Sequence, residues 1–172
     1  IDFRNGCSFS LVDNISGTTS DDTIACTALD DSFMKEKPKY IYPMQPMGFK
    51  FQDAESANIH DIVIRNIFTG GEHHSIICLA TTPAVYNILI ENVREEKPSS
   101  REACVKIYTG YGKGYIKGNL RNISVSNVIS TGSKYAVMVK AAVKDVYFSN
   151  ITQLKLDAEV YSIEGDSENL II

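Results

Sequence analysis

The sequence lacks several features that would assign the chain to a common class. No apolar stretch approaches the roughly 18 residues of a membrane-spanning helix, so we expect no membrane partner. Neither charge sign dominates, because 17 basic and 21 acidic residues leave a net charge of −4, which argues against a nucleic-acid partner. The opening "IDFRNGC", which shows neither an initiator methionine nor a signal-peptide pattern, is typical of mid-domain sequence, so we expect any targeting segment to have been removed or to lie outside this chain. The 44% hydrophobic content in 172 residues is typical of one globular domain, spanning residues 1–172.

The cysteines show no metal-binding pattern. There is no CxxC pair, and no histidine lies at zinc-finger spacing from Cys7, Cys26, Cys78 or Cys104. Cys26 and Cys78 fall within apolar, strand-like runs, where cysteine packs as a small hydrophobic residue. We expect four reduced packing cysteines, and the sequence predicts neither a metal site nor a cofactor.

A repeated pattern organises the chain. Alternating apolar residues are followed by Asn and then by Ile or Val in five segments: "SFSLVDNI" (8–15), "IHDIVIRNI" (59–67), "VYNILIENV" (85–93), "LRNISVSNV" (120–128) and "VKDVYFSNI" (143–151). A second strand-like run follows each segment: "TIACTAL", "SIICLA", "CVKIYT", "YAVMVKA" and "VYSIEG". The distance from the Asn to this second run is constant in four copies, and the third copy carries a short insertion.

This repeat predicts an all-β solenoid, a single-stranded parallel β-helix of about five to six coils. Hairpin turns, which a sandwich would need between successive strands, are few. The repeated asparagines are expected to form an internal ladder at one bend of the coil, with their amides paired between coils. They are Asn14, Asn66, Asn92, Asn127 and Asn150.

Two further features concern the ends of the chain and one insertion. The C-terminal "SENLII" looks like the start of another repeat, so we expect a fragment truncated at both ends. Open strand edges of this kind favour association, so a second copy of the chain is a possible partner, in a homo-oligomer. Residues 30–57 lack the repeat and hold three of the five prolines. We expect this insertion to pack as a flap beside the second-strand wall.

The repeat aligns polar and charged side chains at one corner. The positions seven and eight residues after the ladder asparagine hold Asp21 and Asp22, His73 and His74, and Lys134 and Tyr135. In the third copy, Glu102 and Ala103 take these places if the insertion precedes the strand. Because neighbouring coils stack about 4.8 Å apart, these side chains are predicted to share one edge. Alternation along the second strand places Lys106 and Tyr108 outward on the same wall.

These residues carry a resemblance to a known family. "SDDTIA", "EHHSII" and "VKIYTG" resemble, in order and placement, the Gly-Asp-Asp, Gly-His-Gly and Arg-Ile-Lys motifs of polygalacturonase-like glycoside hydrolases, members of the pectin-lyase-like superfamily. The resemblance implies a right-handed parallel β-helix and acid/base hydrolysis of an acidic, uronate-containing polysaccharide. It also implies an extracellular or periplasmic location.

The resemblance also suggests catalytic residues. Asp21 and Asp22 match the two family carboxylates, of which one protonates the leaving oxygen while a base partner activates water. His73 matches the histidine beside that pair. The third family carboxylate would precede Ile1, outside the chain.

Four residues are candidates for substrate binding. Lys106 stands where the family has the Arg that binds the sugar carboxylate, and Tyr108 stands where it has Lys. His74 and Glu102 complete the set, because the repeat brings them to the same corner. An Arg-to-Lys replacement removes bidentate binding of a uronate.

Other interpretations remain open. Asp is an ordinary turn residue, so Asp21 and Asp22 also fit a plain turn at the start of a strand. A non-catalytic β-helix, either glycan-binding or a tail-spike-like structural stalk, would share the same repeat, since fold alone does not determine activity. A lyase would need calcium ligands, and no cluster of aspartates with the required ligand count occurs in the sequence.

Overall fold

The computed structural model describes residues 1–29, 55–96, 102–110 and 115–172. Residues 30–54 of the predicted insertion (30–57) therefore lie outside the described residues. The expected packing of this insertion as a flap is outside them too. One sheet contains the shorter strands: β1 (Asp2–Arg4), β3 (Ile24–Ala28), β5 (Ile76–Ala80), β7 (Ala103–Tyr108), β9 (Tyr135–Lys140) and β11 (Glu159–Glu164). The other contains β2 (Ser8–Thr19), β4 (Ile59–Gly71), β6 (Val85–Glu95), β8 (Leu120–Ser130), β10 (Lys144–Gln153) and β12 (Glu168–Ile171).

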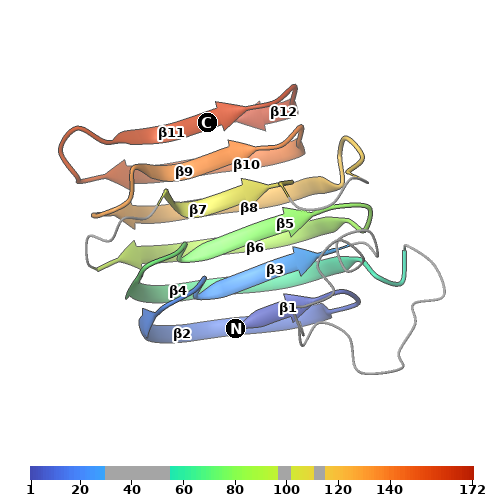
Figure 1. The fold of residues 1–172 in the computed structure, drawn as a ribbon, viewed down its shortest axis with the longest axis horizontal. Coiled ribbons are helices and arrows are strands. Elements are labelled where there is room, and N and C mark those ends of the chain that lie inside the picture. Colours follow the sequence, from blue (N-terminus) through green and yellow to red (C-terminus); the bar gives the residue numbers. More distant parts are fainter. Residues whose placement is uncertain (30–54, 97–101, 111–114) are drawn as a thin grey trace.

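The chain alternates between the two sheets. The strand orders are β1-β3-β5-β7-β9-β11 and β12-β10-β8-β6-β4-β2, and the paired strands run parallel. Each layer of the molecule thus contains one strand of each sheet, from β1 and β2 at one end to β11 and β12 at the other (Figure 1). The expected all-β class with parallel strands is confirmed, and the alternation is compatible with a parallel β-helix.

The strand register follows the repeat. Ile24 pairs with Ile76, Ile76 with Val105, and Val105 with Val137. These residues belong to one buried cluster that also contains core residues of the long strands, such as Ile62. Alternation along β3 and β5 directs every second side chain, such as Ile24, Cys26 and Ala28, into this cluster, as the repeat predicts.

The cysteines contribute to this buried core. Cys26 and Cys78 are register partners within the core, Cys104 is buried too, and Cys7 is partly buried. All four are free thiols. The expectation that the cysteines are packing residues is confirmed for Cys26, Cys78 and Cys104.

The repeated asparagines are aligned, but they do not lie inside. Asn14, Asn66, Asn92, Asn127 and Asn150 have φ between 51° and 58°, a left-handed conformation that Asn adopts more easily than most residues. Their amides pair between layers: Asn92 Nδ2 donates to Asn66 Oδ1 at 3.0 Å and Asn150 Nδ2 to Asn127 Oδ1 at 2.7 Å. All five side chains are exposed. The prediction of an internal ladder is therefore wrong, because the left-handed bend turns the amides outward.

A second ladder runs parallel to the first. Five residues before four of the repeated asparagines, and at the matching position of β12, the backbone is again left-handed, with φ of 51–55°, at Asp61, Asn87, Asn122, Asp145 and Asn169. The amides of three of them donate to the layer before, at 2.6–3.0 Å. The sequence carries this signal as a second Asn or Asp in the later repeats, whereas the first repeat has Phe9 at this position, also with left-handed backbone. The long strands consequently bend twice.

Candidate functional site

The candidate site lies where two turns stack on each other. Residues 20–23 lead into β3 and residues 72–75 lead into β5, one layer away. The Thr23 N–H donates to the His74 carbonyl at 3.0 Å, and the Glu72 N–H donates to the Thr19 carbonyl at 3.2 Å. These main-chain bonds fix Asp21 and Asp22 beside His73 and His74.

Gly71 allows the turns to approach so closely. It has a φ of +139°, and a Cβ atom at this position would lie 2.0 Å from the Thr19 carbonyl oxygen. Any side chain larger than hydrogen would push the second turn away from the first. The position of both histidines therefore depends on a glycine at the end of β4.

Asp22 and His74 form the most buried pair of the site. Asp22 Oδ1 accepts one hydrogen bond from the His74 backbone N–H at 3.0 Å and one from His74 Nδ1 at 2.8 Å. The Asp22 side chain is 18% exposed and that of His74 11% exposed. Burial by itself would raise the pKa of Asp22, but the hydrogen bonds and the charge of His74 together lower it. Asp22 is therefore an ionised carboxylate at neutral pH.

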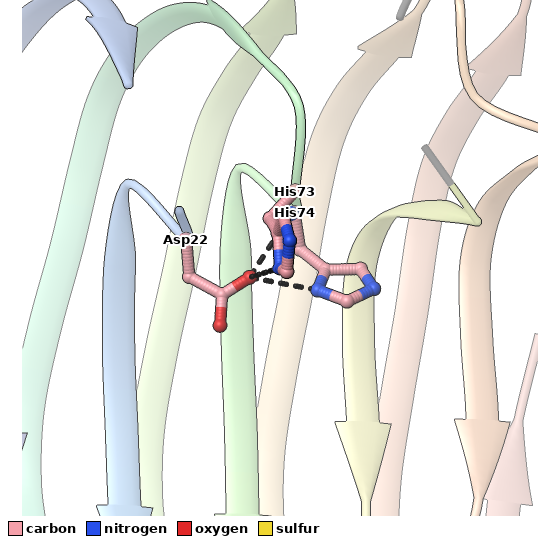
Figure 2. Close-up of side chains that lie close together, drawn as sticks. All are labelled: Asp22, His73 and His74. Carbon is pink, nitrogen blue, oxygen red and sulfur yellow. Dashed lines mark hydrogen bonds and ion pairs between the residues drawn. The ribbon is translucent and has the colours of Figure 1, made fainter. Parts of the chain in front are cut away.

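His73 and Asp21 form the open side of the site. His73 Nδ1 lies 3.3 Å from Asp21 Oδ1 and 4.0 Å from Asp22 Oδ1. The His73 side chain is 56% exposed and that of Asp21 84% exposed. Figure 2 shows both imidazole rings close to the Asp22 carboxylate, which lies between them and the β3 turn. The predicted grouping of Asp21, Asp22, His73 and His74 is confirmed as geometry.

The remaining predicted residues lie in the next layer, on and beside β7. Lys106 Nζ forms an ion pair with Glu102 Oε2, and it also lies 4.4 Å from the centre of the Tyr108 ring. The hydrogen bond from Lys106 lowers the pKa of Glu102, with a smaller contribution from His74. Lys106 is only 8% exposed, so its charge is already engaged within the protein. The three residues lie together, and their binding roles stay predictions.

One group of donor atoms could hold a metal ion. One ligand atom each from Asp22, His73 and His74 lies within 4.8 Å of the other two. Two imidazole nitrogens and a carboxylate oxygen are a donor set typical of transition-metal sites.

The sequence analysis missed a buried carboxylate, Glu95, at the end of β6. The side chain is fully buried, and its oxygens accept hydrogen bonds at 2.5–3.0 Å from the turn after β8: Ser130 Oγ, the backbone N–H groups of Thr131, Gly132 and Ser133, and Ser133 Oγ. Burial would raise the pKa of Glu95, but these hydrogen bonds lower it. No sequence signal marks Glu95, because most of its partners are main-chain groups.

Comparisons with known proteins add no assignment. The chain matches no protein-family model, no curated protein and no solved structure. Within the described ranges, no helix is long and apolar enough to cross a membrane.

Proposed function

We propose that the chain is a segment of a right-handed parallel β-helix of the pectin-lyase-like type, and that Asp21, Asp22 and His73 hydrolyse an acidic, uronate-containing polysaccharide. The motif order in the sequence supports this proposal, and so do two parallel sheets between which consecutive strands alternate. The family resemblance also implies an extracellular or periplasmic location, which we propose for this chain.

The observation that carries the proposal is the ionised state of Asp22 at an accessible corner. Glycoside hydrolysis with inversion needs one ionised carboxylate, which activates water, and one proton donor on the other side of the scissile bond. His74 lowers the pKa of Asp22 and leaves this carboxylate partly exposed, which suits the base. Asp21 is then the candidate proton donor, because the family resemblance pairs it with Asp22 and its exposed side chain is accessible to a substrate.

The surroundings of the pair suit an anionic sugar. His73 is exposed beside both aspartates, and its protonated ring would bind a uronate carboxylate in the substrate. Lys106 would contribute less than the Arg of the family motif, because Glu102 already neutralises its charge. Tyr108, in contact with Lys106, offers an aromatic ring on the same wall.

A specific observation favours the second candidate, a non-catalytic glycan-binding or structural β-helix. The pKa values of Asp22 and Glu102 are both lowered, so neither residue can serve as the acid catalyst, which needs a raised pKa, and the hydrolase would depend on Asp21 alone for its proton. A corner of ionised carboxylates and imidazoles would bind a polysaccharide without cleaving it. The two candidates therefore differ in whether sugar chains are shortened.

The test is release of reducing ends from polygalacturonate and other uronate polysaccharides. We expect cleavage by the unmodified protein and a loss of about 100-fold or more in Asp22→Asn, with folding retained. Asp157→Asn is the matched control, because Asp157 is an exposed turn aspartate with φ of 59°, which Asn tolerates equally well.

The alternative has its own readout in the same samples. Retention of the protein on immobilised polysaccharide without release of reducing ends would support the binding protein and contradict the hydrolase. Equal cleavage by Asp22→Asn and the unmodified protein would contradict the assignment of Asp22 as the base.

A further inference from the structure

We propose that Asp22, His73 and His74 bind one divalent transition-metal ion of the Zn²⁺ class, with a remaining coordination position open to solvent. This inference shares Asp22 and His73 with the proposed hydrolase, but it can be tested separately, because binding of the ion needs no sugar. It also departs from the expectation of no metal, which the sequence analysis drew from the spacing of the cysteines.

The distances between the donor atoms fit a tetrahedral site after small side-chain rotations. Zn²⁺ bonds to nitrogen and oxygen of about 2.1 Å place neighbouring ligand atoms about 3.4 Å apart. Asp22 Oδ1 lies 2.8 Å from His74 Nδ1 and 4.0 Å from His73 Nδ1, on either side of that value. In the metal-bound form, each ring would carry its proton on Nε2 and present Nδ1 to the ion.

The backbone holds two of the three ligands in place before an ion arrives. The His74 N–H donates to Asp22 Oδ1, and the Thr23 N–H donates to the His74 carbonyl, so the two turns cannot slide past each other. Ligands that are fixed in advance lose little conformational entropy on binding. His73 is the mobile ligand, because its side chain is the most exposed of the three.

Charge and donor type select the class of ion. Asp21 Oδ1, 3.3 Å from His73 Nδ1, adds a second carboxylate beside Asp22, and this concentration of negative charge attracts a cation. Two imidazole nitrogens favour Zn²⁺, Co²⁺ or Ni²⁺ over Ca²⁺ and Mg²⁺, which prefer oxygen ligands throughout.

The third histidine of the sequence provides a matched control. His60 Nδ1 also pairs with a carboxylate, Asp61 Oδ2 at 2.6 Å, and its ring is stacked on Tyr86 with centroids 5.0 Å apart. Among the described residues, His60 belongs to no group of three potential metal ligands. His60 therefore resembles His74 in being paired with an aspartate, but it lacks a third potential metal ligand nearby.

The experiment is isothermal titration of ZnCl₂ into chelator-treated protein. We expect one Zn²⁺ per chain and a loss of affinity of about tenfold or more in each of His73→Ala, His74→Ala and Asp22→Asn. His60→Ala and Cys7→Ser should bind as the unmodified protein does. Absence of Zn²⁺ binding to the unmodified protein would overturn the proposal. It would also be overturned if the three ligand variants bound Zn²⁺ as tightly as the unmodified protein does.

Folding and activity are separated in the same experiment. His73→Ala removes an exposed side chain, so its circular dichroism spectrum should be unchanged and its lost affinity cannot reflect unfolding. Zn²⁺ binding without cleavage of any polysaccharide would retain the metal site and reject the hydrolase. Cleavage by a protein that binds no Zn²⁺ would reject the metal site and retain the hydrolase.

Discussion

Asp22 and Glu95 are both carboxylates that link one layer of the molecule to the next, yet their environments differ. Glu95 is fully buried, and hydroxyl and backbone N–H groups of the turn at residues 130–133 donate to both of its oxygens. Asp22 accepts its two bonds from His74, both on Oδ1, and its side chain keeps some contact with solvent. Both pKa values are lowered against the effect of burial.

The difference shows how a structural carboxylate can be distinguished from one available for chemistry. A buried charge is tolerated when hydrogen bonds replace its hydration, and Glu95 meets that condition within the protein. Asp22 lies beside two imidazoles at an accessible edge, so a ligand can still reach it. A lowered pKa alone does not distinguish a structural carboxylate such as Glu95 from an accessible one such as Asp22. The exposure of the side chain and the number of hydrogen-bond donors around it do distinguish them.

The largest expected effect is on Glu95. Glu95→Ala would leave the hydroxyl and backbone N–H groups of the turn at residues 130–133 without their acceptor, so we expect a loss of about 3–5 kcal/mol in the free energy of unfolding. Urea denaturation measures it. Glu96→Ala is the control, because the side chain of Glu96 is exposed, and its cost should be about 0.5 kcal/mol or less. Equal costs for the two variants would remove the contrast between Glu95 and Asp22.

The next effect concerns the glycine that brings the two turns of the site together. Gly71→Ala would place Cβ 2.0 Å from the Thr19 carbonyl oxygen, so the turn carrying His73 must move. Gly17→Ala is matched in backbone conformation, with φ of +142° against +139°, but nothing lies within 4 Å of its Cβ position. We expect Gly71→Ala to cost about 2 kcal/mol more than Gly17→Ala in thermal or urea unfolding.

A functional measurement extends this comparison. Gly71→Ala should also weaken Zn²⁺ binding, since it separates His73 and His74 from Asp22, while Gly17→Ala should leave binding unchanged. Equal stability of the two alanine variants would show that the turns can separate without cost.

The third effect is the dependence of stability on pH. The pKa of Glu95 is lowered from 4.5, so its ionised form stabilises the folded state above the unfolded-state pKa. This contribution is lost as the pH falls below that value through the folded-state pKa. We expect the free energy of unfolding to decrease with acidification from neutral pH, and to decrease less steeply in Glu95→Gln. An identical slope in the two proteins would assign the acid sensitivity to other carboxylates.

The sequence predicts those parts of the fold and site that repeat. Alternating apolar residues located the strands, and the repeat spacing brought Asp21 and Asp22 to His73 and His74, because both are periodic properties of the chain. The burial of Glu95 was not predicted, since most of its hydrogen bonds come from backbone N–H groups, which every residue type except proline has. Burial of Lys106 also escaped prediction, because strand alternation gives the face of a side chain but not what covers it.

The smallest expected effect is on the stability of Asp22→Asn. The Asn Oδ1 atom can still accept the His74 backbone hydrogen bond, and the edge is open enough for water to solvate the rest. We therefore expect a cost of about 1 kcal/mol in urea denaturation, well below that of Glu95→Ala. Asp157→Asn should cost still less, because Asp157 is an exposed turn residue. A loss as large as that of Glu95→Ala would make Asp22 a structural carboxylate and would leave any change in Zn²⁺ affinity or polysaccharide cleavage explained by unfolding.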